Sequence, residues 1–187
     1  MRYTIPYKDA TPARISQGFH SEHKGLDMIS VITSFGQGVP LVAPEDVRII
    51  AFSGDKFTPN TTEPLKKGFG VIMFGMESNT FHLFWHTGPV FPVRVGDYVD
   101  RGKIVATMSN SGNVFVAGQY VPISERYTNK GTHLHWENFG TYVNGKKGDF
   151  RDPSLYIDWD LKPTYTLAEQ LTATTKQLLR ISNLIST

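Results

Sequence analysis

The stretch GTHLHWENF, residues 131–139, alternates polar and apolar side chains. Successive side chains of a β-strand point to opposite faces, so we expect His133, His135 and Glu137 to share one face. The leucine and tryptophan between them fall on the other face, which suits a hydrophobic core. In isolation, a His-x-His-x-Glu face is most often only the polar side of a strand, so its meaning depends on the rest of the chain.

Short apolar runs separated by turn residues continue outward from this strand. Gly and Pro are plentiful among the 187 residues (17 and 11), and no helix-period segment of useful length lies between Arg14 and Ile157. These features predict a mostly β, antiparallel domain. We expect its strands at 39–43, 47–52, 70–75, 80–86, 98–108 and 132–139.

Two long connections interrupt the expected strands, at 53–68 and 109–131. Loops of this length in a compact domain are usually functional or mobile. The second contains Phe115, Tyr120 and Tyr127, aromatic residues that a fully solvated loop would not need. We expect this loop to wall a groove.

The C-terminal segment has a different pattern. Apolar residues recur at a spacing of four and three, and Thr166 with Glu169 forms a capping-box sequence. We therefore predict one domain over residues 1–160 and a helical extension over 161–187, which packs on the domain, pairs with another copy or docks on a larger assembly. The expected stripe is Leu167, Leu171, Thr174, Leu178, Ile181 and Ile185.

Composition excludes several classes of function. The chain has no cysteine, which rules out disulfides, thiolate nucleophiles and Cys-based zinc sites. The net charge is only +2, and the lysine pairs at 66–67 and 146–147 are isolated, so we expect no nucleic-acid partner. No apolar run is long enough to cross a membrane or serve as a signal peptide, so we expect synthesis in a cytosol, no membrane insertion and, if the protein works outside, another route of exit.

All six histidines fall into three pairs: His20 with His23, His82 with His86, and His133 with His135. In the first, His23 lies four residues before Asp27, with a glycine between them that would let the chain bend. In the middle pair, strand alternation would place His82, Phe84 and His86 on one face. Each pattern alone is common by chance, but together they indicate one zinc site.

Zinc chemistry explains why these residue types would gather. Catalytic zinc takes three His, Asp or Glu ligands and keeps a fourth position open. Two imidazoles and one carboxylate leave the ion positively charged, able to activate water and polarise a carbonyl. There is no H-E-x-x-H motif, so a spare histidine would have to transfer the proton. We expect one Zn²⁺ per chain.

The order of these motifs resembles the lysostaphin-type (LytM-like) zinc endopeptidases of bacterial and phage cell-wall metabolism. That family shows His-x-Gly-x-Asp, a strand ending near Tyr-x-His, Gly-Asp-x-Val and His-x-His. The resemblance covers residues 14–157. The corresponding segments here are HKGLD (23–27), FWH (84–86), GDYV (96–99), HLH (133–135) and the closing segment RDPSLYI (151–157).

The resemblance implies a role for each matching residue. The implied zinc ligands are His23, Asp27 and His135. His86 and His133 are the implied catalytic residues, one as general base and the other as oxyanion stabiliser, with the assignment open between them. Four more residues are expected near the substrate or behind the ligands: His20, His82, Glu137 and Tyr120.

The family fold is a narrow antiparallel β-groove, related to the duplicated hybrid motif, with zinc on its floor. The implied substrate is a peptidoglycan peptide, either a glycine-rich cross-bridge or a D-alanine-containing stem cross-link. This chain departs from the family at Phe84, where tyrosine is common, and in its longer 109–131 loop.

The leading prediction is therefore a zinc endopeptidase acting on the bacterial cell wall. Lack of a signal peptide favours a phage endolysin or a virion tail-associated lysin, with the C-terminal helix as a contact for another copy or for tail proteins. Two alternatives stay open: a non-catalytic structural or activator module of the same fold, and a zinc carboxypeptidase that trims stem peptides.

Overall fold

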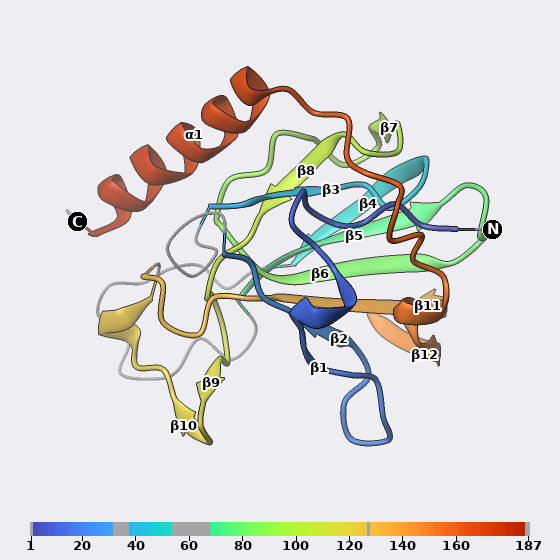
Figure 1. Ribbon diagram of the computed structural model, residues 1–187, viewed down its shortest axis with the longest axis horizontal. Coiled ribbons are helices and arrows are strands. Elements are labelled where there is room, and N and C mark those ends of the chain that lie inside the picture. Colours follow the sequence, from blue (N-terminus) through green and yellow to red (C-terminus); the bar gives the residue numbers. More distant parts are fainter. Residues whose placement is uncertain (1, 32–37, 54–67, 127, 186–187) are drawn as a thin grey trace.

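The computed structural model describes residues 2–31, 38–53, 68–126 and 128–185 (Figure 1). Within these ranges, the main sheet has eight antiparallel strands, in the spatial order β1-β2-β11-β6-β5-β4-β7, with β12 paired to β11. Two small sheets, β3–β8 and β9–β10, complete the β-structure. The predicted fold class, mostly β and antiparallel with a C-terminal helix, is confirmed.

The strands and helices have the following bounds. The main sheet contains β1 Ile15–Gln17, β2 Leu26–Met28, β4 Val47–Ser53, β5 Phe69–Gly75, β6 Phe81–Thr87, β7 Tyr98–Val99, β11 Leu134–Val143 and β12 Lys146–Arg151. The small sheets contain β3 Pro40–Val42, β8 Ile104–Thr107, β9 Phe115–Val116 and β10 Gln119–Tyr120. The helices of the described residues are the short 3₁₀ helices η1 Pro12–Arg14, η3 Ile123–Glu125 and η4 Pro153–Leu155 and the α-helix α1 Leu167–Ile185.

The side chains of strand β11 alternate between the two faces of the main sheet, as the sequence pattern predicts. Leu134 and Trp136 are fully buried in the main core, which lies between the main sheet and the β3–β8 pair. On the opposite face, Phe139 joins a smaller cluster with Leu83 and Ile72. Because the apolar residues of β11 anchor it in the core, the histidine-bearing face must point away from that core.

The described strands differ from the predicted ones in several places, and the short strands β1, β2, β9 and β10 were not predicted. The strand expected over 98–108 is two strands, β7 and β8, because Gly102 takes a left-handed φ of 80° and turns the chain between them. Strand β12 was not predicted; it pairs with β11 through a two-residue turn in which Asn144 and Gly145 both have positive φ. That backbone geometry is the one that asparagine–glycine turns favour in hairpins.

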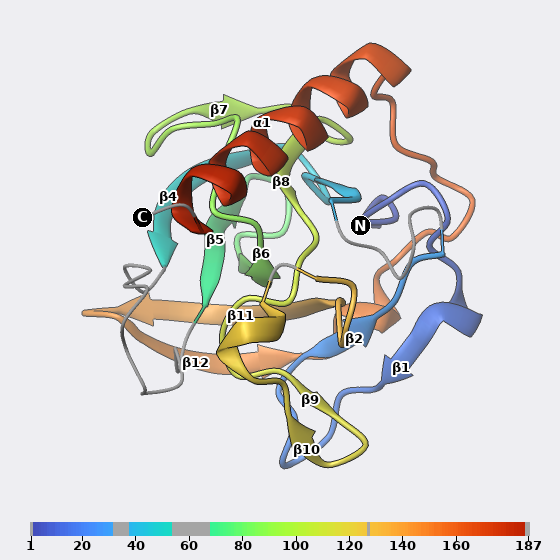
Figure 2. The same cartoon turned by 90° about the vertical axis from the view of Figure 1, so that its left-hand side faces the viewer.

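The two expected long loops have different outcomes. Most of 53–68 lies outside the described residues. The 109–131 segment carries the β9–β10 hairpin and the 3₁₀ helix η3. The hairpin projects from the body of the protein, below the end of β11 in Figure 2. Its tight turn is made by Ala117 and Gly118, both at positive φ.

Helix α1 begins with the predicted capping box. The backbone N–H of Thr166 donates to Glu169 Oε2 (2.6 Å), and that of Glu169 donates to Thr166 Oγ1 (3.2 Å). The helix lies across β3 and β8 (Figure 2), where Thr174 Oγ1 donates to Gly38 O. Leu167 and Leu171 of the predicted stripe are exposed. A role of the helix in self-association or in binding tail proteins stays a prediction.

Among the described helices, none is both long and apolar enough to cross a membrane.

Candidate metal centre

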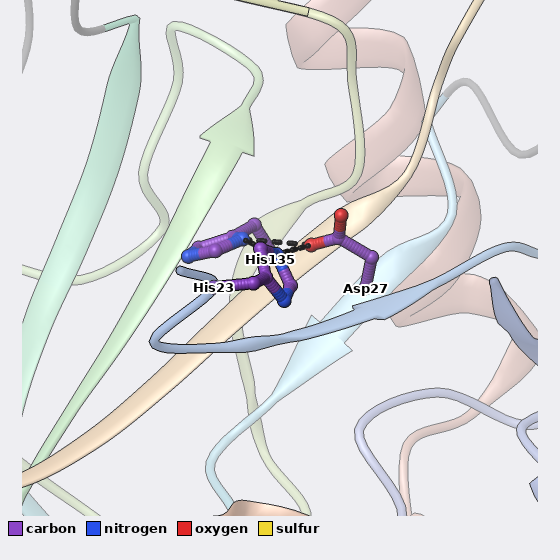
Figure 3. A group of neighbouring side chains, drawn as sticks. All are labelled: His23, Asp27 and His135. Atoms are coloured by element: carbon purple, nitrogen blue, oxygen red, sulfur yellow. Dashed lines mark hydrogen bonds and ion pairs between the residues drawn. The ribbon is translucent and has the colours of Figure 1, made fainter. Parts of the chain in front are cut away.

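Three predicted ligands meet at one point although they come from distant parts of the chain (Figure 3). Strand β2 supplies Asp27 and pairs with β11, which places Asp27 directly opposite His135. His23 precedes β2 in the same segment. Asp27 Oδ1 lies 2.7 Å from His135 Nδ1 and 3.2 Å from His23 Nε2, and the two ring nitrogens are 3.2 Å apart.

The spacing of these three atoms fits a tetrahedral zinc ion. Ligand atoms held at zinc distances in a tetrahedron lie roughly 3.4 Å from one another. The observed separations of 2.7–3.2 Å are slightly shorter, as expected for atoms that share hydrogen bonds. Two imidazoles and one carboxylate, with side chains 13–15% exposed, are the donor set of a catalytic zinc site that keeps an open position.

Gly25 lies at a bend of the chain, as the sequence predicts, and its φ is not among the positive values. Close packing adds a second requirement for glycine at this position. A Cβ at this position would lie 2.5 Å from His135 Nε2 and 2.6 Å from Cε1. The absence of a side chain at Gly25 therefore leaves the room that the His135 ring occupies.

Backbone carbonyls orient two imidazoles of the centre, that of the predicted ligand His23 and that of His133. His23 Nδ1 lies 2.9 Å from Gly18 O, and His133 Nδ1 lies 2.8 Å from Gly131 O. A carbonyl oxygen can only accept, so Nδ1 carries the proton in both rings and Nε2 is left as a lone-pair donor. His133 Nε2 is directed at the centre, 3.8 Å from Asp27 Oδ2.

His86 reaches the centre through a β-bulge. Phe69 and Gly70 of β5 face Thr87 and Trp85 of β6, so His86 is an extra residue in its strand, and its φ is +59°. Bulges commonly re-aim a side chain beside an active site. The His86 ring lies 4.6 Å from the ring of His133, centroid to centroid, and its Nδ1 donates to Ser111 O at 2.6 Å.

The prediction that His82, Phe84 and His86 share one face is therefore wrong for His86. His82 and Phe84 point into the main core, where both rings contact Trp136. The bulge turns His86 away from them and toward His133 and His135. Strict alternation could not anticipate this, because it assumes an unbroken strand.

His82 is a core residue. The sequence analysis expected it near the substrate or behind the ligands, and the structure places it in neither position. Its side chain and that of Glu45 are both 0% exposed, and Nε2 lies 2.9 Å from Glu45 Oε1. Nδ1 accepts from Trp136 Nε1 and Asn138 Nδ2, each at 3.3 Å. Both nitrogens are thus satisfied by the protein.

The pKa values of this buried pair are both displaced downward. Burial lowers the pKa of His82 below its ordinary 6.5, despite the attraction of Glu45. Burial alone would raise the pKa of Glu45, but hydrogen bonds from His82 and Ser78 lower it below its ordinary value. The pair therefore consists of a neutral imidazole that donates to an ionised carboxylate.

Glu137 lies behind the predicted ligand His135, which is one of the two places that the sequence analysis allows for it. His135 Nε2 lies 3.4 Å from Glu137 Oε1, and the other carboxylate oxygen accepts from Lys147 Nζ. Glu137 is only 7% exposed. A carboxylate that holds the far nitrogen of a ligand histidine sets which nitrogen faces the metal. Lys147, from the unpredicted strand β12, was not identified from the sequence.

Three histidines of the centre differ in the direction in which their pKa is shifted, and therefore in their charge. Burial alone would lower the pKa of His135, but hydrogen bonds to Asp27 and Glu137 raise it to about 9. Burial lowers the pKa of His86 well below its usual value, and it lowers that of His133 as well. Without a metal, His135 holds the positive charge while His86 and His133 are neutral.

The Asp27 carboxylate is ionised in the same network. Burial alone would raise its pKa, but the hydrogen bond with His135 and the charges of the surrounding imidazoles lower it below the usual value. An ionised carboxylate is the form that binds a cation.

Two of the four residues expected near the substrate or behind the ligands, His20 and Tyr120, lie outside this cluster of side chains. His20 is exposed, with its ring 5.6 Å from that of His23. Tyr120 belongs to the β9–β10 hairpin, where its hydroxyl accepts from Arg126 Nη2 and its ring stacks on the Arg126 guanidinium. The backbone of His20 exchanges two hydrogen bonds with that of His23 (2.9 and 3.2 Å), whereas the Tyr120 side chain is held by Arg126.

Solved structures share this architecture. LytU superposes with a TM-score of 0.51 and 19% identity over 80% of this chain and 94% of that one. A zinc-containing peptidase from Vibrio cholerae superposes with a TM-score of 0.53 and 19% identity, over 85% of this chain and 41% of that one. Lysostaphin from Staphylococcus simulans superposes with a TM-score of 0.51 and 18% identity, over 87% of this chain and 60% of that one. The chain has the lysostaphin fold. No protein-family model matches the sequence, and no curated protein matches it either.

The lysostaphin fold explains why the ligands converge. In this chain, β2 and β6 flank β11 on its two sides, so Asp27, His135 and the end of β6 are brought side by side by strand pairing alone. The site is thus a product of the sheet order rather than of a mobile loop. The expectation of an antiparallel lysostaphin-type sheet is confirmed.

Proposed function

We propose that this protein belongs to the lysostaphin-type peptidases and is a zinc-dependent endopeptidase that hydrolyses peptide bonds of bacterial peptidoglycan. One observation carries the proposal. Two imidazoles and a carboxylate converge at zinc-ligand spacing, and two further imidazoles, His86 and His133, border them, each with Nδ1–H donating to a backbone carbonyl. The fold shared with lysostaphin and LytU supports the same proposal.

His23, Asp27 and His135 would hold the zinc ion through Nε2, one carboxylate oxygen and Nδ1, respectively. When bound, zinc supplies Lewis-acid activation of the scissile carbonyl and of water. Glu137 and Lys147 keep the His135 ring in the orientation that presents Nδ1.

His86 and His133 are suited to proton transfer. Both are neutral, and in both Nδ1–H is committed to a carbonyl, so Nε2 carries a lone pair. Either nitrogen can take a proton from the attacking water. Once protonated, the same nitrogen becomes a donor that can stabilise an oxyanion or deliver its proton to the leaving amine. One histidine would act as base and the other as oxyanion stabiliser.

The test is digestion of purified peptidoglycan by the zinc-loaded protein, with and without a chelator, followed by mass spectrometry of the fragments. We expect internal peptide bonds to be cut, activity to disappear with the chelator and to return with zinc. Tight zinc binding with no cleavage of any wall would instead indicate a non-catalytic module. Release of single amino acids from free stem peptides would indicate a carboxypeptidase.

The origin of the protein as a phage lysin stays a prediction from the sequence. Its measurement is separate from that of the activity: detection of the chain by mass spectrometry in purified virions would establish a tail-associated lysin, and its presence only in lysates of infected cells would establish an endolysin.

A further inference from the structure

A groove leads away from the metal centre toward the β9–β10 hairpin. Its inner part, about 280 Å³, is lined by Asp27 and His133 and by residues of β1 and the hairpin. Its outer part is about 530 Å³. The two parts are continuous because they share four lining residues: Ile29, Val116, Gly131 and Thr132.

Apolar side chains gather along this groove although they are exposed to solvent. Ile29 (40% exposed) and Val31 (58%) line one side, and Phe115 (59%) and Val116 (38%) line the other. Exposed apolar side chains that cluster beside a site, rather than being scattered, usually mark a binding surface. We call the surface formed by these four residues, Gly131 and Thr132 the hairpin groove.

The wall formed by the hairpin is held in place by buried polar contacts. Arg126 is 4% exposed and donates from Nη1 to Asn110 O (2.7 Å) and from Nη2 to the Tyr120 hydroxyl. The hairpin also rests on Gly131, where a Cβ would lie 2.8 Å from Val116 Cγ2. This bracing pre-organises the apolar wall, which lowers the entropic cost of binding a peptide against it.

We propose that the hairpin groove binds the substrate residue next to the scissile bond and selects an aliphatic side chain there, so that alanine-containing cross-links are preferred over all-glycine bridges. This inference rests on the proposed function. Asp27 and His133 line the inner end of the groove, so it offers a path for the part of a peptide that extends from the metal centre on one side.

The selectivity follows from the chemistry of the wall. Valine, isoleucine and phenylalanine side chains bind by removing apolar surface from water, and a glycine residue has no side chain to offer them. Burial of one methyl group should favour the alanine substrate about fourfold. The groove has no described lysine or arginine among its lining residues, so a strongly acidic peptide would gain nothing there.

The experiment compares kcat/KM on synthetic pentapeptides, one all-glycine and two with a single alanine on either side of the central bond. We expect one alanine peptide to be cut at least about fourfold better by the wild type. Val116→Ser should bring the ratio close to one. Val143→Ser is the control for the same chemical change: Val143 is an exposed valine (65%) at the far end of β11, outside the groove, so this variant should leave the ratio unchanged.

A second variant and a second measurement guard against misfolding and loss of metal. Phe115→Ala removes a largely exposed side chain and should lower the same ratio. Binding of the peptides to chelator-treated protein, followed by NMR at the groove methyl groups, should show the same preference without any cleavage.

The outcomes separate the two proposals. Equal cleavage of all peptides, a preference for glycine, or an unchanged ratio in both groove variants would overturn the groove assignment while leaving the endopeptidase intact. Failure to cut any of these peptides or any peptidoglycan would overturn the proposed function and this inference with it.

Discussion

Two histidine–glutamate pairs lie on opposite faces of the main sheet, and they have different roles. His82 Nε2 bonds Glu45 at 2.9 Å inside the core, and His135 Nε2 lies 3.4 Å from Glu137 at the metal centre. Both glutamates are buried, at 0% and 7% exposure. The partner of Nε2 is therefore the same kind of group in each pair.

The difference lies in the second ring nitrogen. His82 Nδ1 is occupied by two donors from the protein, which completes its hydrogen bonding. His135 Nδ1 instead faces Asp27 and His23, groups that also bind cations. On the proposed function, a buried histidine is available as a metal ligand when one nitrogen faces other potential ligands, and it is structural when both nitrogens are satisfied by the protein.

The largest effect is expected at the two histidines that border the ligands. His86→Ala and His133→Ala should each lower kcat by about 10²–10⁴-fold, because each removes a proton-transfer or oxyanion-stabilising group. Zinc content should stay at the wild-type level. Steady-state cleavage assays with metal analysis of the same samples check this, and loss of zinc in either variant would move that residue into the ligand set.

The core pair should affect stability instead of activity. His82→Ala removes the donor to a fully buried carboxylate, so the free energy of unfolding should fall by about 3–5 kcal/mol. Urea titration of the purified protein measures the loss. The exposed His20→Ala is the matched control and should change stability by less than about 0.5 kcal/mol. A comparable loss in both variants would mean that the buried pair is not a specific contributor.

Glu137 should act on the metal rather than on the fold. Glu137→Gln keeps the shape but removes the charge that holds His135 and Lys147, so zinc affinity should fall about 10–100-fold. Competition with a chelator of known affinity measures it. Glu22→Gln, in the exposed loop beside His23, should leave affinity unchanged. Equal affinity in wild type and Glu137→Gln would show that Glu137 does not position the ligand.

Acid should weaken the core pair in a defined direction. The folded pKa of His82 lies below 6.5, so the unfolded chain binds more protons as the pH falls below that value, and stability decreases. The lowered pKa of Glu45 adds a further loss below about its ordinary 4.5. His82→Gln keeps a donor and an acceptor but cannot titrate. Between pH 6.5 and 5, its unfolding free energy should fall less steeply than that of wild type, by up to about 1.4 kcal/mol per pH unit; parallel slopes would contradict this.

Much of the fold could be predicted because alternation and turn residues are local signals. Strands β4, β5, β6 and β11 lie where the apolar runs predict them. Strand β12 was missed although Asn144–Gly145 is a strong hairpin signal, because its residues KKGDFR lack an apolar pattern. The break at Gly102 was missed because an isolated glycine in an apolar run does not reveal its φ.

The candidate site likewise has residues that could be predicted from local sequence and features that could not. His23, Asp27 and His135 could be chosen because their motif spacing resembles a known family, and the structure brings them together. The bulge at His86 and the carbonyl of Ser111 that orients its ring depend on pairing between strands far apart in sequence. The contact of Lys147 with Glu137 could not be predicted from the sequence for the same reason, because it depends on the register between β11 and β12.

Zinc content, measured after dialysis in wild type, His135→Ala and His82→Ala, tests the central claim most directly. If His135 binds the metal and His82 is structural, the wild type should contain about one zinc per chain. A folded His135→Ala variant should contain close to none, and the less stable His82→Ala variant about one. Wild-type zinc content in His135→Ala, or loss of zinc from folded His82→Ala, would contradict the assignment of the metal centre.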